Sequence, residues 1–269
     1  MNPLLYITWT ANPEILSWEF IHIRWYGLLF ATGFAIGYYL TQRLFKAEKL
    51  PEAWLDGLLL TIVAGAIIGA RLGHVFFYQW DYYQDHLAEI PQIWQGGLAS
   101  HGGAIGLFLA LWIFSRRVSK KPLLWITDRI AMSVALAGTL IRLGNLMNHE
   151  IVGAPTDVPW AFIFTRYEAD PVPRHPSQLY EALAYLLIFV VLYRMYWYTA
   201  AKEKIGQLTG WFFVLVFGAR FVIEFFKEVQ VAKELSMTLN LGQQLSIPLI
   251  IWGIYLILRP RPKNEKLSN

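Results

Sequence analysis

The stretch GTLIRLGNLMNHEIVG, residues 138–153, decides how the rest of the chain is interpreted. It begins inside an apolar helix, AMSVALAGTL, and then becomes polar without a break. At 3.6 residues per turn, Arg142, Asn145 and His149 share one helix face, with Asn148 at its edge. An arginine near bilayer depth costs about 2.5–3.5 kcal/mol on insertion scales. We therefore expect Arg142 to point into the protein and meet an anion.

A lone membrane arginine also has simpler interpretations, namely a buried salt bridge or a side chain that snorkels to the membrane surface. Here Arg142 is accompanied by two amides, an imidazole and the carboxylate of Glu150. These neighbouring polar groups favour a binding site.

The composition is that of a polytopic, all-α membrane protein. The 269 residues are 56% hydrophobic and 16% aromatic, and the mean hydropathy is +0.39. The net charge of +4 does not indicate nucleic-acid binding, because the basic residues occur in short runs between apolar segments. With no cysteine, the chain cannot supply a disulfide, a thiolate metal ligand or a thiol nucleophile. Residues 1–17 lack the basic start of a cleavable signal, so we expect the first helix to remain in the mature protein.

Seven segments are apolar enough and near the roughly 20 residues that a span requires. They lie at about 18–41, 54–78, 97–115, 123–148, 177–199, 207–228 and 243–258. Residues 1–269 are expected to form a single integral-membrane domain. The one long connection, 149–176, is rich in proline and aromatic residues and is expected to form a small periplasmic cap. Small residues spaced by four in the second segment (Gly65, Gly69, Gly73) predict close helix packing.

The linkers alternate in charge. The linkers after the first, third, fifth and seventh segments carry thirteen basic residues: Arg43, Lys46, Lys49, Arg116, Arg117, Lys120, Lys121, Lys202, Lys204, Arg259, Arg261, Lys263 and Lys266. The opposite side has three: Arg166, Arg174 and Lys233. This bias predicts an amino terminus outside, in the periplasm, and a cytoplasmic carboxyl terminus.

Four arginines are expected to converge at the outer leaflet from different helices or helix ends: Arg71, Arg142, Arg174 and Arg220. The helical carboxylates there, Glu150, Glu181 and Glu224, are too few to neutralise all of them. The excess charge predicts an anionic ligand, and the anion available at that depth is a phospholipid headgroup. An intrahelical pair between Arg220 and Glu224 is the simpler interpretation of that spacing and is compatible with ligand binding.

The remaining polar residues limit the chemistry. His101 begins the third segment, where it is either structural or a general base beside helix amides that favour an anion. No GxSxG or HExxH motif occurs, so neither a serine hydrolase nor a metal enzyme is indicated, and no metal site or cofactor is expected. Guanidinium groups, an imidazole and the tyrosine Tyr26 suit a phospholipid-using transferase of the outer leaflet. A seven-helix transporter or flippase is the alternative, but it predicts charged residues in the inner half, which is nearly free of them.

Several motifs together resemble bacterial prolipoprotein diacylglyceryl transferase. RLGNLMNHEIVG (142–153) is similar to the family signature R-x-G-N-F-x-N-x-E-x-x-G. The resemblance extends in order along nearly the whole chain, through WYG (25–27), GAR (69–71), HGG (101–103), RHPSQLYEA (174–182) and ARFVIEFF (219–226).

The resemblance implies a multi-pass enzyme of the bacterial inner membrane with its active site facing the outer leaflet. Such an enzyme moves the diacylglyceryl group of phosphatidylglycerol onto the lipobox cysteine of a preprolipoprotein and releases glycerol 1-phosphate. The substrate then provides the thiol that this chain lacks.

The expected roles follow from the resemblance. Arg142 and Arg220 hold the phosphate and stabilise its departure, His101 takes the thiol proton, and Tyr26 places the headgroup. The supporting residues are Asn145, Asn148 and Glu150 around Arg142, Gly153 at the turn into the cap, and Arg71 and Glu224 as further phosphatidylglycerol contacts.

Overall fold

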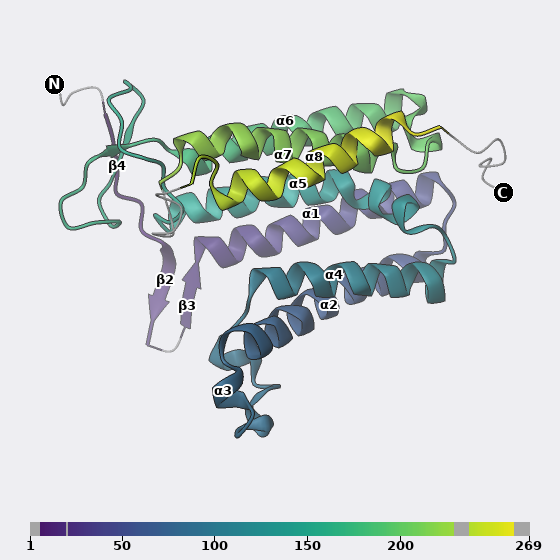
Figure 1. Cartoon of the computed structure of the whole chain (residues 1–269), viewed down its shortest axis with the longest axis horizontal. Helices are drawn as coiled ribbons and strands as arrows, with labels where there is room; N and C mark the ends of the chain where they lie inside the picture. The colour runs from purple at the N-terminus through teal and green to yellow at the C-terminus, as the bar shows by residue number, and fades with distance from the viewer. Residues whose placement is uncertain (1–5, 20, 229–236, 261–269) are drawn as a thin grey trace. The chain divides into compact units, whose positions relative to one another are not determined.

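The computed structural model describes residues 6–19, 21–228 and 237–260 (Figure 1). These residues divide into two compact units. Unit 1 contains the chain up to Tyr39 and from Thr127 onward, and unit 2 contains Leu40–Ile126. Helices α1 and α5 each cross the boundary between them. Lys233, Arg261, Lys263 and Lys266, which contribute to the charge bias, lie outside the described residues.

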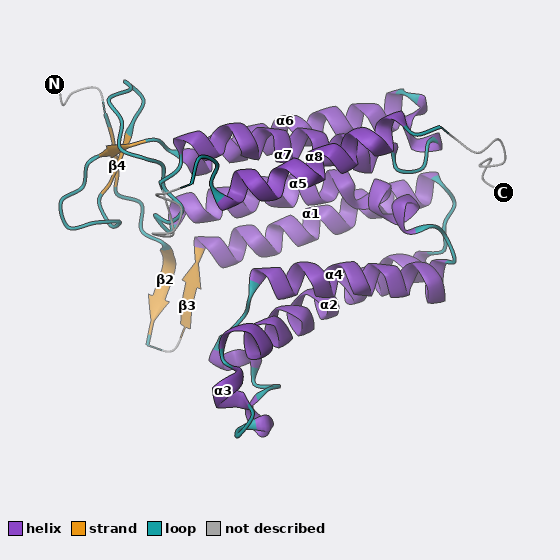
Figure 2. Ribbon diagram, viewed as in Figure 1, coloured by secondary structure: helices purple, strands orange, loops and turns teal. Residues whose placement is uncertain are grey.

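Helices dominate both units (Figure 2). The α-helices are α1 Trp25–Ala47, α2 Glu52–Tyr78, α3 Trp80–Tyr83, α4 Ser100–Phe114, α5 Leu123–Met147, α6 Ser177–Tyr198, α7 Gln207–Ile223 and α8 Leu241–Leu258. The strands are β1 Ile7–Trp9, β2 Glu14–Trp18, β3 Ile21–Arg24, β4 Phe162–Phe164 and β5 Pro173–Arg174. Short 3₁₀ turns are η2 Leu87–Glu89, η3 Ile93–Gln95, η5 Ala200–Glu203 and η6 Glu224–Phe226, and η4 Ser115–Ser119 is a π-helical turn.

Each of the seven expected apolar segments contains a helix. Among the described residues, five helices are long and apolar enough to cross a membrane, namely α2, α5, α6, α7 with η6, and α8. The protein is therefore a mostly helical, polytopic membrane protein. The all-α prediction was wrong in one respect, because it missed five short strands.

The start of the first segment is also corrected. Residues expected to begin a helix at 18 form the antiparallel hairpin β2–β3, in which Trp18 pairs with Ile21 and Glu14 with Arg24. The helix begins only at Trp25. The run IHIR of β3 alternates apolar and polar residues as a strand does, whereas the prediction considered only how many apolar residues the segment holds. Arg24 thus belongs to a strand and not to a helix end.

The expected cap contains a small sheet that the amino-terminal segment completes. Strand β1 pairs in parallel with β4, and β5 pairs antiparallel with β4. Leu146, Val152, Phe162 and Phe164 form the buried core beneath this sheet, with Trp9 packed against it. The cap therefore rests directly on the end of α5, where the polar stretch begins.

Within unit 1, close helix contacts place the ends of the helices. Figure 1 shows α5, α6, α7 and α8 running alongside one another. Ser133 on α5 donates a hydrogen bond of 3.1 Å to the Gly37 carbonyl of α1. At the opposite end of α5 from the cap, buried Asp128 accepts bonds from the backbone amides of Gly206 and Thr209, at 2.6 and 2.8 Å, and so caps the first turn of α7.

Unit 2 is built on the pair α2 and α4. A Cβ atom added at Gly73 would lie 2.6 Å from the Cα of Gly102, and one added at Gly69 would lie 2.6 Å from the Cα of Gly106. No side chain fits between these backbones. The prediction that the small residues of the second segment serve helix packing is confirmed.

Candidate functional site

The polar stretch after α5 forms a tight turn. The helix ends at Met147, and His149 and Ile151 then adopt left-handed backbone angles, with φ values of +53° and +58°. A residue other than glycine costs about 1 kcal/mol or more in this conformation, so surrounding contacts must hold the turn. Buried His149 supplies one of them, since its Nε2 lies 2.9 Å from the Ala11 carbonyl. The expectation that His149 shares a face with Arg142 is therefore wrong, because the helix ends before it.

Arg142 faces the interior, as expected of a membrane arginine. Its Nε is ion-paired with Glu181 Oε2 of α6, and its Nη1 donates a 3.1 Å hydrogen bond to Asn145 Oδ1. The side chain of Glu181 is fully buried and that of Arg142 is 14% exposed. Arg142 also interacts with Tyr185 one turn further along α6. The buried salt bridge that was the simpler interpretation is thus real.

Glu150 is held by amides from two elements. Asn145 Nδ2 and Asn148 Nδ2 both donate to its Oε1, at 2.7 and 3.2 Å. Gln178 of α6 donates to its backbone carbonyl at 2.7 Å. Because Asn145 also accepts from Arg142, these bonds form a continuous chain from Glu150 to the guanidinium. Asn145 thus contacts both Arg142 and Glu150, and Asn148 contacts Glu150.

Lys227 completes the cluster and was not anticipated from the sequence. Its Nζ lies 2.9 Å from Glu181 Oε1 and 3.1 Å from Glu224 Oε2, and its side chain is 5% exposed. Two cations, Lys227 and Arg142, therefore share the two oxygens of Glu181. The signal in the sequence was a lysine three residues after Glu224, at the end of an apolar helix.

Arg220 lies one helical turn before Glu224 on α7 and is half-buried. Among the described residues the expected pair between Arg220 and Glu224 does not form, because Glu224 pairs with Lys227. Arg220 is close enough to Tyr185 to interact with it electrostatically, so it belongs to the same cluster as Arg142. Within the described chain its guanidinium has no carboxylate partner, which leaves it available for an anionic ligand.

Tyr26 lies against the same end of α5. A Cβ atom added at Gly144 would approach Tyr26 Cδ2 to 2.8 Å and its Cα to 3.2 Å. The glycine between Arg142 and Asn145 thus lets the first turn of α1 contact α5. This contact places Tyr26 beside the residues that carry the polar cluster.

Gly153 fixes the entry of the chain into the cap. Its amide donates to the His175 carbonyl at 2.9 Å, and it forms an antiparallel bridge with Lys227. A Cβ atom at this position would lie 2.5 Å from His175 Cβ and 2.6 Å from the Phe226 carbonyl oxygen. Only glycine fits here, and its close approach aligns the segment that carries Lys227.

Arg174 does not join the cluster as an unpaired cation. Its guanidinium lies 2.8 Å from Glu168 Oε2 and 3.0 Å from Glu228 Oε2, and its Nη1 also donates to the Gly153 carbonyl at 3.3 Å. The prediction counted only carboxylates on helices and so overlooked Glu168 and Glu228. Arg174 instead ties the cap to the chain beside Lys227.

The cap should lose stability as the pH falls. The hydrogen bond from Arg174 lowers the pKa of Glu168, and burial lowers the pKa of His175 below its ordinary 6.5. Both groups bind fewer protons when folded, so stability is full at neutral pH, begins to fall below about pH 6.5 and falls further as Glu168 becomes protonated. Hydrogen-exchange protection of residues 152–176 should decrease in the same two steps as the pH falls. Glu168→Gln should remove the step at the lower pH. Protection that rises on acidification would contradict this origin.

In unit 2, His101 and Arg71 have different surroundings. His101 occupies the first turn of α4 and is exposed. Arg71 is 3% exposed, and its guanidinium donates to the carbonyls of Glu89, Ile90 and Gly96 at 2.8, 2.7 and 2.8 Å. These bonds hold the loop before α4, and the contact of Arg71 with phosphatidylglycerol stays a prediction.

The described residues contain no group of three histidine, aspartate or glutamate side chains that could hold a metal ion. What unit 1 does contain is a buried cluster of cations and carboxylates at one end of apolar helices. An integral-membrane protein with such a cluster at the end of its helices belongs to the class that handles an anionic group at the membrane boundary.

Comparison with known proteins specifies that class. Residues 13–259 match the family described as prolipoprotein diacylglyceryl transferase. The chain is 48% identical over 259 residues to the phosphatidylglycerol–prolipoprotein diacylglyceryl transferase of Chloroherpeton thalassium, with 96% of each chain covered. The enzymes of the same name from Tolumonas auensis and Porphyromonas gingivalis are 48% and 44% identical, covering 93% and 98% of this chain and 96% and 98% of their own. The protein belongs to the prolipoprotein diacylglyceryl transferase family.

Proposed function

We propose that this protein transfers the diacylglyceryl group of phosphatidylglycerol to the lipobox cysteine of a preprolipoprotein and releases glycerol 1-phosphate. The observation that carries the proposal is the cluster in unit 1, where Arg142 and Lys227 share Glu181 while Arg220 has no carboxylate partner in the described chain. The relatives of this protein are named for phosphatidylglycerol and prolipoprotein. In the proposed reaction phosphatidylglycerol supplies the anion and the prolipoprotein supplies the thiol.

We also propose the membrane arrangement. The chain forms one integral-membrane domain of seven spans, in which α1 and α4 join the five longer apolar helices. The amino terminus and the 149–176 cap face the periplasm, the carboxyl terminus is cytoplasmic, and the active site opens to the outer leaflet of the inner membrane. The charge bias of the linkers supports this orientation.

Arg142 and Arg220 are proposed to bind the phosphodiester. Guanidinium groups match the oxygens of a phosphate, and their hydrogen bonds strengthen as charge builds on the leaving group. Glu181 keeps Arg142 in place, and Glu224 holds Lys227 beside it. Asn145, Asn148 and Glu150 hold the side of Arg142 that faces the turn. Tyr26 orients the headgroup from the first turn of α1.

His101 is proposed to accept the thiol proton, because an imidazole changes charge near neutral pH whereas a free thiol has a pKa of about 8.5. The thiolate sulfur attacks the terminal carbon of the diacylglyceryl group. A carbon–sulfur bond forms while the bond between that carbon and the phosphate oxygen breaks. The electron pair of the broken bond stays on that oxygen, which leaves as part of glycerol 1-phosphate. The proton from the thiol remains on His101 until it passes to water.

Transfer by the purified protein tests the proposed function. Phosphatidylglycerol labelled in its diacylglyceryl group is incubated with a lipobox peptide, and peptide mass and free glycerol phosphate are measured together. The two products should appear in equal amounts with the cysteine peptide, and neither should appear with a serine peptide or without phosphatidylglycerol. Lipid movement across proteoliposomes without thioether formation would instead indicate a transporter.

The base is tested by His101→Asn, which retains polarity without a titratable ring. Transfer at neutral pH should fall by about 10²–10³-fold, in the range observed when one proton-transfer group is lost. Part of the rate should return at raised pH, where the thiol ionises unaided. A pH profile parallel to that of the unaltered protein would show that another group removes the proton.

A further inference from the structure

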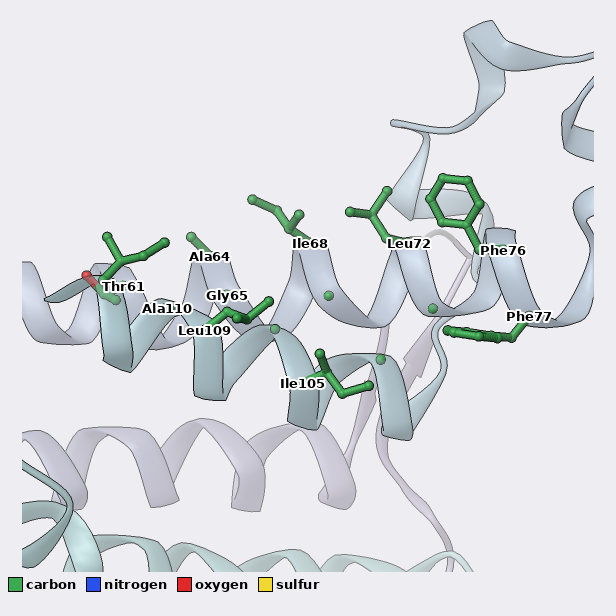
Figure 3. A pocket seen from close by; sticks show the side chains of 15 residues that line it. Thr61, Ala64, Gly65, Ile68, Leu72, Phe76, Phe77, Ile105, Leu109 and Ala110 are labelled. Atoms are coloured by element: carbon green, nitrogen blue, oxygen red, sulfur yellow. The ribbon is translucent and has the colours of Figure 1, made fainter. Parts of the chain in front are cut away.

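Helices α2 and α4 of unit 2 form an apolar groove with a volume of about 590 Å³ (Figure 3). Ile68, Leu72 and Phe76 line it from α2, and Ile105 and Leu109 line it from α4. A volume of several hundred Å³ is typical of small-molecule sites. The groove has not been used in any step of the proposed reaction.

The floor of the groove consists of the glycines at which the two helices touch. A Cβ atom added at Gly69 or Gly106 would collide with the opposite helix, so the floor cannot carry side chains. The larger residues stand beside this contact as walls. The result is an open groove along the helix pair, with backbone at its floor and hydrocarbon side chains at its sides.

The groove offers almost nothing for a polar ligand. The hydroxyl of Thr61, at one end, donates to the Gly57 carbonyl of its own helix at 2.6 Å. From Thr61 to Phe77 the α2 side is about 24 Å long at 1.5 Å per residue, so the groove follows the helix through much of a bilayer core of about 30 Å. It is also continuous with the apolar surface of α2, which is long and apolar enough to cross a membrane. An extended hydrocarbon chain fits both its shape and its chemistry.

We propose that this groove holds one acyl chain of the donor phospholipid, a proposal that rests on the proposed function. The ester end lies toward Gly102 and the methyl end toward Thr61. Gly102 follows His101, the proposed base, in the first turn of α4, whereas Thr61 lies in the middle of the long helix α2. A chain seated in this direction brings the glyceryl carbon toward the end of the groove where His101 lies.

The proposal predicts dependence on acyl-chain length. Ile113 lines the groove about 16 Å along α4 from Gly102, a depth that a sixteen-carbon chain reaches and an eight-carbon chain does not. Ile113→Trp should therefore raise KM for dipalmitoyl-phosphatidylglycerol about fivefold and leave KM for the dioctanoyl lipid within about twofold. The effect is modest because lipid tails are as apolar as the groove, so packing alone favours the bound chain. Phe108→Trp is the matched control, since Phe108 is similarly exposed on α4, 58% against 52%, but does not line the groove.

The outcomes separate this proposal from the proposed function. If the unaltered protein transfers the lipid but Ile113→Trp and Phe108→Trp affect both chain lengths alike, the groove proposal is wrong and the function stands. A second measurement does not depend on activity. Phosphatidylglycerol with a photoreactive group at one chain end should crosslink to residues 61–68 or 109–113, and unlabelled phosphatidylglycerol should compete better than phosphatidylethanolamine. Equal competition by the two lipids would show that the groove takes bulk lipid and would overturn the proposal.

Discussion

Arg142→Ala is expected to lower kcat for diacylglyceryl transfer by about 10²–10³-fold, the loss typical of removing one group that stabilises developing charge. Arg142 is proposed to contact the phosphate, and it is held toward that role by Glu181 and Asn145. Arg220→Ala should have a similar effect. The measurement is the rate of labelled diacylglyceryl transfer to a lipobox peptide at saturating lipid. Near-normal rates in both variants would contradict phosphate binding by these arginines.

The Arg142→Ala variant needs a control for folding. Removing Arg142 leaves buried Glu181 with Lys227 as its partner among the described residues, and breaking a buried ion pair costs about 3–5 kcal/mol. The double variant Arg142→Met/Glu181→Gln removes both charges and should recover most of the thermal stability. Its transfer rate should remain low, because no guanidinium returns. Recovery of activity together with stability would reduce Arg142 to a structural role.

Gly153→Ala should abolish both the docking of the cap and transfer. The added methyl group would lie 2.5 Å from His175 Cβ and 2.6 Å from the Phe226 carbonyl oxygen, which are separations that side chains do not adopt. Relief requires the segment that carries Lys227 to move, and overpacking of this kind costs about 1–3 kcal/mol or more. We expect a lower Tm, increased hydrogen exchange in residues 152–176 and a transfer rate below one-hundredth of the original.

Gly27→Ala is the matched control for Gly153→Ala. Gly27 lies in α1 with no atom within 4 Å of an added Cβ, so alanine there should leave activity unchanged and stabilise the helix by about 0.5–1 kcal/mol. If Gly153→Ala behaves like Gly27→Ala, the contact between the cap and the Lys227 segment has no part in the reaction.

Much of the fold could be predicted from the sequence because spans leave a strong signal. Long apolar runs predicted the positions of the helices to within a few residues, apart from the first. The error at residues 18–24 arose because an exposed hairpin and the start of a helix can be equally rich in apolar residues. The parallel pairing of β1 with β4 could not be predicted, since those three-residue strands are separated by more than 150 positions.

The candidate site was predicted in its residue types but not in its pairing. The sequence indicated that Arg142 must meet an anion, and Glu181 was among the candidates, but periodicity within one helix does not show which neighbouring helix supplies the partner. Lys227 was missed for the same reason, because its two carboxylates come from two helical elements. The partners of Arg71 and Arg174 were not predicted, because backbone carbonyls and cap carboxylates were not counted.

The central claim is that Arg142 and Arg220 contact the phosphate of phosphatidylglycerol, and a carbon–phosphorus distance tests it most directly. Protein labelled with ¹³C at arginine Cζ is prepared in a maltoside detergent, which contains no phosphorus, and receives phosphatidylglycerol. Dephasing of the ¹³C signals by ³¹P should place phosphorus within about 4–5 Å of Cζ in Arg142 and Arg220, as guanidinium–phosphate hydrogen bonds require. It should leave Arg174 unaffected, because Glu168 and Glu228 occupy its guanidinium. Absence of dephasing at Arg142 and Arg220 with the lipid bound would contradict the account.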